Sequence, residues 1–302
     1  MGRCGASGNF CLIFPGVDSQ KLRIADSRDV PVLWGRGGKA LAHPGGVFAA
    51  ASNSVLRAIL APGCAVCDQP LDAPLEGAIC RACWRGVPSI APPICALCGD
   101  HLPAGLVETL CARCSRELPA VALARSAGVY DGSLRHMIHA LKYQRRRMIA
   151  PWLAARMQRD GQEVLDGADA VVPVPLHAWR HLQRGFNQAD DLAMGLGLPV
   201  WRALRRHRAG PPQASLPAAQ RPANARGAYA LAWCERMRPQ RLRGAVLVLI
   251  DDVMTTGATL NACAGVLRDA GAASVRSLTA ARAVAARPPQ PQPTRHLSIV
   301  RR

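Results

Sequence analysis

The sequence predicts an α/β domain with a mostly parallel sheet flanked by helices, preceded by a small cysteine-rich module. Three observations indicate this. From about residue 120, apolar segments of strand length alternate with segments of helical periodicity, the pattern of a parallel sheet. One apolar segment, 246–250, ends in two aspartates and a hydroxyl-rich turn. Eight of the twelve cysteines form evenly spaced pairs before the sheet begins.

Composition and charge favour one or two domains with an anionic partner. The chain has 302 residues, enough for a substantial core, and a formal net charge of +18. Phosphates, nucleic acid or an anionic surface would suit this charge. However, lysine occurs only at Lys21, Lys39 and Lys142, and the remaining positive charge is arginine, so a GC-rich genome explains the bias equally well. Because no apolar run reaches transmembrane length and residues 10–15 are too short for a secretory signal, we expect no membrane span and a cytoplasmic location.

The N-terminal third contains an irregular segment followed by a metal-binding pattern. Residues 1–50 lack periodicity, so we expect a disordered extension or a wrongly assigned start. A short helix over 55–62 leads into the cysteine module at 55–118. A Cys-x-x-Cys turn presents two thiolates to one tetrahedral zinc ion, and two turns close a Cys4 site. Two structural zinc ions are therefore expected, with the ligands Cys64, Cys67, Cys80, Cys83, Cys95, Cys98, Cys111 and Cys114.

The pairing and the purpose of this double zinc ribbon stay open. The spans 64–83 and 95–114 share their internal spacing, which favours pairing the first pair with the second and the third with the fourth. A cross-braced arrangement, first with third, is the alternative. Such small modules fold on metal and serve as structural or docking elements. Nucleic-acid contact is the competing hypothesis, supported by Arg81, Arg85 and Arg113.

The elements of the main domain, 120–285, follow in order. A strand over 121–129 and a turn at 130–132 precede a helix with the apolar face Leu134, Met137, Ile138 and Leu141. Lys142 and the arginines 145–147 suit its C-terminal end. A helix over 151–159, a strand over 170–175, a loop over 176–185 and a helix from about 186 come next.

The second half of this domain holds the most informative segment. A long mobile loop is expected over 205–228, then a buried strand over 246–250. Leu260, Cys263, Ala264 and Leu267 give the next helix its apolar face, and Gly271 suits its C-terminal end. A strand over 274–280 and a Pro-rich tail over 286–302 complete the chain.

The turn after the strand at 246–250 has the chemistry of a sugar-phosphate site. It lies at the carboxyl end of a strand and the amino end of a helix, where unpaired N–H groups and the helix dipole attract an anion. Asp251 and Asp252 suit vicinal hydroxyls or a hydrated magnesium ion. The Gly and Lys spacing of a P-loop is absent.

This segment resembles the phosphoribosyl-diphosphate (PRPP) motif of type I phosphoribosyltransferases. The resemblance implies that Asp251 and Asp252, the catalytic candidates, contact the ribose. It implies a 5′-phosphate held by Thr255, Thr256, Gly257, Ala258 and Thr259. Mg²⁺ would accompany PRPP.

Three further motifs narrow the resemblance to the ComF family, also described as GntX-like. They are Val172-Pro173-Val174-Pro175-Leu176-His177, Arg184-Gly185-Phe186-Asn187-Gln188-Ala189, and the segments around Gln213 and Arg221–Tyr229. The match covers about 55–285. It implies a zinc ribbon on a type I phosphoribosyltransferase fold and a link to competence, DNA uptake and the partners of that machinery. Additional PRPP contacts are implied at Pro175, Leu176, Arg184, Gly185, Asn187, Gln188 and Lys142.

Several of these residues have a second interpretation. Residues 184–188 would hold pyrophosphate and hydroxyls, or only shape a loop and cap a helix. Lys142 would reach a phosphate or cap its helix. His177 and His181 are expected to be loop polar groups and not bases.

Two functions therefore compete. In the first, the protein is a phosphoribosyltransferase (a pentosyl glycosyltransferase) whose acceptor the sequence does not identify. In the second, it is a non-enzymatic DNA-uptake protein that keeps a phosphoribosyl pocket and binds single-stranded DNA or a docking partner. The intact acidic pair favours the first.

Overall fold

The computed structural model describes residues 52, 62–72, 74, 77–105, 108–176, 178–206 and 227–284. These residues belong to one compact unit, Val32–Arg302. The expected N-terminal extension, nearly all of the helix over 55–62, most of the loop over 205–228 and the C-terminal tail lie outside the described ranges. Among the helices that are described, none has the length and hydrophobicity that a bilayer span requires.

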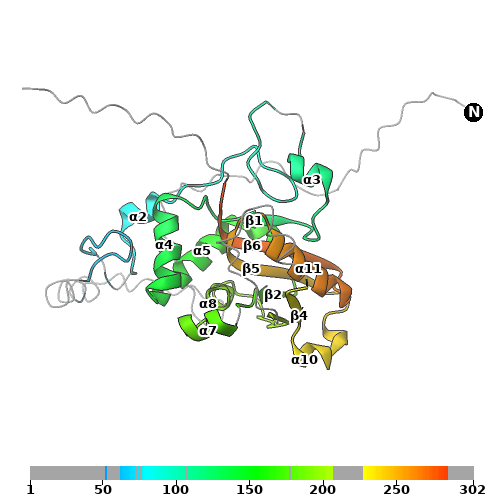
Figure 1. The fold of residues 1–302 in the computed structure, drawn as a ribbon. Coiled ribbons are helices and arrows are strands. Elements are labelled where there is room, and N and C mark those ends of the chain that lie inside the picture. The colour runs from blue at the N-terminus through cyan, green and yellow to red at the C-terminus, as the bar shows by residue number, and fades with distance from the viewer. Residues whose placement is uncertain are drawn as a thin grey trace, which may run out of the picture. The chain divides into compact units, whose positions relative to one another are not determined.

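A four-stranded parallel sheet forms the centre of the main domain, as predicted (Figure 1). Its order is β1 (Ala124–Ser126), β6 (Ser274–Arg282), β5 (Val246–Met254) and β2 (Ala170–Pro173). β5 lies inside the sheet, with Leu247 to Ile250 fully buried, because its apolar side chains pack on both faces. The β5–β6 register runs from Val246 opposite Ser274 to Met254 opposite Arg282.

Helices cover the sheet. α5 (Ala150–Asp160) packs on β6, and α8 (Gln188–Met194) packs on β5, β2 and α5. α11 (Ala258–Asp269) packs on β5 and β6, and its predicted apolar face is buried against Leu247 and Leu249. α4 (Gly132–Tyr143) carries a buried apolar face that is also as predicted. Shorter elements are the 3₁₀ turn Arg147–Ile149, α6 (Gln162–Leu165), α10 (Trp233–Arg236) and the 3₁₀ turn Pro239–Arg241.

Five element predictions need correction, and the first four concern the strand over 121–129 and residues 176–206. The first strand is shorter than 121–129, with an isolated bridge between Val129 and Arg282. The loop over 176–185 contains a helix, α7 (Ala178–Arg184), because Ala, Leu, Gln and Arg favour helix. The next helix begins at Gln188 and not near Phe186. Residues 204–206 form β3 (Leu204–Arg206), which pairs antiparallel with β4 (Tyr229–Leu231).

The last correction concerns the strand that carries the acidic pair. β5 does not stop at Ile250 but continues through both aspartates, because β6 continues to pair beside it and Asp251 lies opposite Thr279. Successive residues of a strand face opposite sides of the sheet. The two carboxylates therefore point to different faces.

The cysteine module forms two small units that precede β1. Each contains a helix of one turn that begins directly after a cysteine: α2 (Arg81–Arg85) after Cys80 and α3 (Ala112–Arg116) after Cys111. The second unit joins the core of the main domain, where Cys95, Cys98 and Cys114 share a cluster with β5 and α11. The Ala124 N–H also donates to the Leu97 carbonyl at 2.7 Å.

Candidate phosphoribosyl and zinc sites

The acidic pair lies at the carboxyl end of β5, and its second member, Asp252, faces a lysine. Asp252 Oδ1 is 2.7 Å from Lys142 Nζ, and these side chains are 13% and 16% exposed. Burial lowers the pKa of Lys142, but the charge and hydrogen bond of Asp252 outweigh it, so this pKa is raised overall. The structure thus brings Lys142, which the sequence left between a phosphate contact and a helix cap, to the acidic pair.

Asp251 faces the α11 side of the sheet in a different environment. Burial, and next the charge of Asp252, raise the pKa of Asp251 to about 7, although the Asp252 N–H and Lys142 act in the opposite direction. That N–H donates to Asp251 Oδ1 at 2.8 Å. Burial raises the pKa of Tyr229, and the charges of Cys263 and Asp251 add to this effect. Asp251 therefore ionises near neutral pH beside Tyr229.

A ligand that contacts the Asp251 carboxylate would bind in a pH-dependent way because of this raised pKa. An ordinary aspartate has a pKa of about 3.9. Between about pH 4 and the folded-state pKa of about 7, the folded chain binds a proton that the unfolded chain does not, so the free energy of unfolding falls as pH rises through this window. A sugar hydroxyl or Mg²⁺ favours the ionised carboxylate, so binding at pH 6 should release this proton.

Calorimetry in two buffers of different ionisation enthalpy measures the release of this proton on binding. We expect the heat of PRPP·Mg binding at pH 6 to differ between the buffers and to converge at pH 8, where Asp251 is already ionised. The same heat in both buffers at pH 6 would contradict this assignment.

The loop between β5 and α11 has the features of an anion site. Thr255 is exposed, and Thr256 and Thr259 are partly exposed. Gly257 has a φ of 76°, a left-handed conformation that favours glycine, and it forms the N-cap of α11 without a side-chain cap. The first N–H groups of a helix have no intrahelical partners and can receive a phosphate. We call residues 255–259 the phosphate loop.

Two arginines that the sequence analysis did not name, Arg180 and Arg206, join Arg184 in a group of cations near Tyr229, whose side chain interacts with Thr259 of this loop. Burial, then the charges of Arg184 and Arg206, lower the pKa of Arg180, so both of those cations lie within electrostatic reach of Arg180. Arg206 stacks on Tyr229 with 5.6 Å between its Cζ and the ring centroid, and its buried Nε has no hydrogen-bond partner among the described residues. Neighbouring cations repel one another, and a buried N–H group needs an acceptor. A bound ligand with several negative charges would satisfy both. The spacing of Arg180 and Arg184, four residues apart on a helix, could have signalled this.

The segment after β2 contains half-buried residues and residues whose side chains hold the local structure. Pro175 and Leu176 are half-buried directly after the strand. The Asn187 side chain donates to the Val174 carbonyl at 3.1 Å and accepts from the Ala189 N–H at 3.2 Å, as a residue that caps α8 and shapes the loop does. Arg184 donates to Gln188 Oε1 at 2.9 Å, while the buried Gln188 Nε2 has no hydrogen-bond partner in the part of the chain that the structure describes. Gly185 has a φ of 77° between them.

The eight cysteines form two groups with the pairing that the repeat favoured. In each group, all four sulfurs lie within 4.8 Å of one another. The first group is Cys64, Cys67, Cys80 and Cys83, and the second is Cys95, Cys98, Cys111 and Cys114. Tetrahedral zinc with bonds of about 2.3 Å separates its sulfurs by roughly 3.8 Å. The Cys67–Cys80 and Cys98–Cys111 sulfur distances are 3.7 and 3.6 Å, so both groups fit zinc.

In each group the surroundings favour the thiolate form at one cysteine, while burial and neighbouring sulfurs raise the pKa of Cys83 and Cys114. Burial acts in the opposite direction, yet backbone N–H groups lower the pKa of Cys64 to about 7 and that of Cys95 to about 6. The N–H groups of Val66 and Cys80 donate to Cys64 Sγ at 3.4 and 3.3 Å. Such turns hold thiolates in place for a metal ion.

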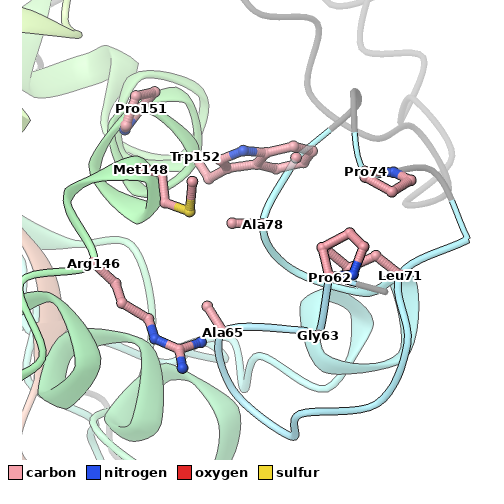
Figure 2. Close-up of a pocket in the computed structure, with 11 residues that line it drawn as sticks. Pro62, Gly63, Ala65, Leu71, Pro74, Ala78, Arg146, Met148, Pro151 and Trp152 are labelled. Atoms are coloured by element: carbon pink, nitrogen blue, oxygen red, sulfur yellow. The ribbon is translucent and has the colours of Figure 1, made fainter. Parts of the chain in front are cut away.

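A separate pocket lies between the first cysteine group and α5. Figure 2 shows Trp152 and Met148 facing Ala65 and Ala78 across it, with Arg146 at one side. Its lining is mostly apolar and includes no residue of the phosphate loop. It is therefore distinct from the candidate phosphoribosyl site.

Comparison with known families defines the class of protein. Residues 55–115 match a double zinc ribbon domain, and residues 182–298 match a phosphoribosyl transferase domain. The fold and the two Cys4 groups agree with both matches.

Comparison with individual proteins then defines the family. DNA utilization protein YhgH of Salmonella typhi is 36% identical over 165 residues, covering 50% of this chain and 68% of that protein. Competence protein F of Haemophilus influenzae is 32% identical over 166 residues, covering 52% and 71%. The chain belongs to the ComF family of these proteins. A solved structure of the allosteric regulatory enzyme of purine biosynthesis is 23% identical over 43% of this chain and 25% of its own, with a TM-score of 0.28, too weak a likeness to bear on function.

Proposed function

We propose that this protein binds PRPP with Mg²⁺ at the carboxyl end of β5. One observation carries the proposal: a buried acidic pair, with a carboxyl that ionises near pH 7, directly precedes the anion-binding loop. The acidic pair suits the ribose hydroxyls of a ribose 5-phosphate, and the loop suits its phosphate. The two features together distinguish a sugar phosphate from a simple anion.

The proposed ligand fits the arrangement of charges. The phosphate loop holds the 5′-phosphate, and Asp251 and Asp252 accept hydrogen bonds from the ribose hydroxyls. Arg180, Arg184 and Arg206, together with the turn at Pro175 and Leu176, face the pyrophosphate. The carboxylate pair suits a hydrated Mg²⁺ as well, which would neutralise charge on the pyrophosphate as it leaves C1′. The protein's own share of such a transfer is positioning and charge stabilisation.

Calorimetry with PRPP and Mg²⁺ tests this proposal directly. The purified protein should give a saturable binding heat, and the absence of any heat would refute PRPP as the ligand. A screen of PRPP consumption across nucleobases and nucleic acids then tests transfer to an acceptor.

The relatives and an exposed aromatic residue support a second candidate function, single-stranded DNA binding during DNA uptake. Tyr143 at the end of α4 is 62% exposed. Arg184 stacks on its ring at 5.0 Å, and His139 lies against it at 4.7 Å. An exposed aromatic ring among cations is a stacking platform for unpaired bases.

We expect Tyr143→Ala to weaken the binding of single-stranded DNA about tenfold, because one stacked base contributes roughly 1–3 kcal/mol. Trp233→Ala is the control, since Trp233 is 73% exposed on α10 and the arginine–ring contacts among the described residues involve other rings. Fluorescence anisotropy at 50 and 200 mM salt measures both variants, and affinity should fall steeply with salt. Equal losses in the two variants, or affinity independent of salt, would contradict this function.

A further inference from the structure

Arg113 connects the second cysteine group to the phosphate loop. It lies in α3 between two members of that group, Cys111 and Cys114. Its Nη2 donates to Cys98 Sγ at 3.5 Å, and its Nη1 donates to the Thr256 carbonyl at 2.9 Å. One guanidinium thus contacts a metal-ligating sulfur and the backbone of the loop.

The bond to Thr256 determines the direction of a loop N–H group. The Thr256 carbonyl and the Gly257 N–H belong to one planar trans peptide and point to opposite sides of it. When Arg113 holds the carbonyl on the side of the zinc ribbon, the Gly257 N–H points away from the ribbon. Gly257 is the left-handed N-cap of α11, so the orientation of this peptide shapes the anion site.

Arg282 forms a second, buried connection between the same two regions. It is 1% exposed and lies opposite Met254, the residue before the phosphate loop. Its guanidinium donates to the Cys98 carbonyl at 2.6 Å, to Asp100 Oδ1 at 3.0 Å and to Met254 Sδ at 3.3 Å. The base of the loop therefore rests on the turn that carries Cys98.

The first cysteine group makes its contacts elsewhere. Trp84 packs edge to face on Trp152 of α5 with 5.6 Å between ring centroids. Asp68 lies 3.7 Å from Arg146. These contacts lead to α5 and the segment before it, so the two zinc sites differ in what they support.

We propose that Arg113 is a positioning residue for the phosphate loop and that the second Cys4 site, loaded with zinc, holds Arg113 in place. Coordination of Cys111 and Cys114 fixes the helix turn between them. Loss of that metal frees the guanidinium and, through it, the Thr256–Gly257 peptide. The part of this inference that concerns ligand binding rests on the proposed PRPP site.

The test compares Arg113→Ala with Arg116→Ala. Arg116 lies on the same helix and is exposed, and among the described residues its side chain bonds only to the Ala112 carbonyl in its own turn, so it is a matched control. Hydrogen exchange of residues 255–260 in the unliganded protein should accelerate in Arg113→Ala and stay at the parent rate in Arg116→Ala. PRPP·Mg affinity should fall about tenfold in Arg113→Ala alone, as expected for one charge-assisted hydrogen bond. Unchanged exchange and unchanged affinity in Arg113→Ala would overturn the proposal.

Coupling between two sites is reciprocal, which provides a measurement without substitutions. Bound PRPP·Mg should raise the affinity of the protein for one of its two zinc ions, measured at equilibrium against a competing chelator with a colorimetric indicator. Zinc affinities that PRPP leaves unchanged would count against the coupling. If the parent protein gives no PRPP heat at all, the proposed function fails, while the exchange comparison still decides the role of Arg113.

Discussion

We expect the variant Asp251→Asn with Asp252→Asn to lose all measurable heat of PRPP·Mg binding. Asparagine keeps the shape of each side chain but removes the negative charge that a ribose hydroxyl or Mg²⁺ needs. The two substitutions differ in their effect on stability. Asp251 is already half neutral near pH 7, so its amide should cost little, whereas Asp252→Asn leaves the buried Lys142 cation without its partner.

A third substitution separates binding from folding. Adding Lys142→Met removes the unpaired cation and should recover part of the thermal stability that Asp252→Asn loses, without restoring PRPP binding. Asp269→Asn, at the exposed end of α11, is the control for loss of one negative charge and should bind as the parent does. Binding that persists in the double variant would show that the acidic pair is not part of the ligand site.

The second large effect concerns the two zinc sites. Cys114→Ser should lower the free energy of unfolding of the main domain by several kcal/mol, whereas Cys67→Ser should leave its main transition close to that of the parent. Cys114 is 2% exposed within the core cluster that contains β5 and α11, while Cys67 is exposed. A metal site that is part of the core contributes its binding energy to the stability of that core.

Thermal unfolding followed by circular dichroism and metal analysis measures this difference. Each variant should hold one zinc ion and the parent two. An equal drop in Tm for Cys67→Ser and Cys114→Ser would contradict the asymmetry between the two sites.

Local patterns were sufficient for most of the fold. The apolar run of β5, the helical face of α11 and the equal spacing of the cysteine pairs are short-range signals that depend on a few neighbouring residues. They predicted the parallel sheet and the two Cys4 groups, which the structure and the family matches confirm. The helix α7 was missed because its seven residues are too few to show a clear helical period, and the strand pair β3–β4 because its partners are separated by a long segment.

In the candidate site, too, local sequence patterns predicted some features, and others depended on contacts between distant residues. The residue types around Asp251 and Thr255–Thr259 indicated a sugar-phosphate ligand, because carboxylates and a helix start suit its two halves. The partnership of Lys142 with Asp252 was not predictable, since it depends on how α4 lies against β5. Likewise, the sequence left residues 184–188 between ligand contacts and a helix cap, and only the bonds of Asn187 to Val174 and Ala189 show that Asn187 caps α8.

The sequence by itself determined which chemical groups are present and in what local order: thiolate pairs, an acidic pair and a hydroxyl-rich turn before a helix. Only the tertiary structure decided which of these groups act on one another. Arg113 and Thr256 are far apart in the chain, yet a hydrogen bond of 2.9 Å joins them. Burial of Asp251 between sheet and helix likewise raises its pKa to about 7. Both effects depend on distance and solvent exclusion, which are properties of the packed chain.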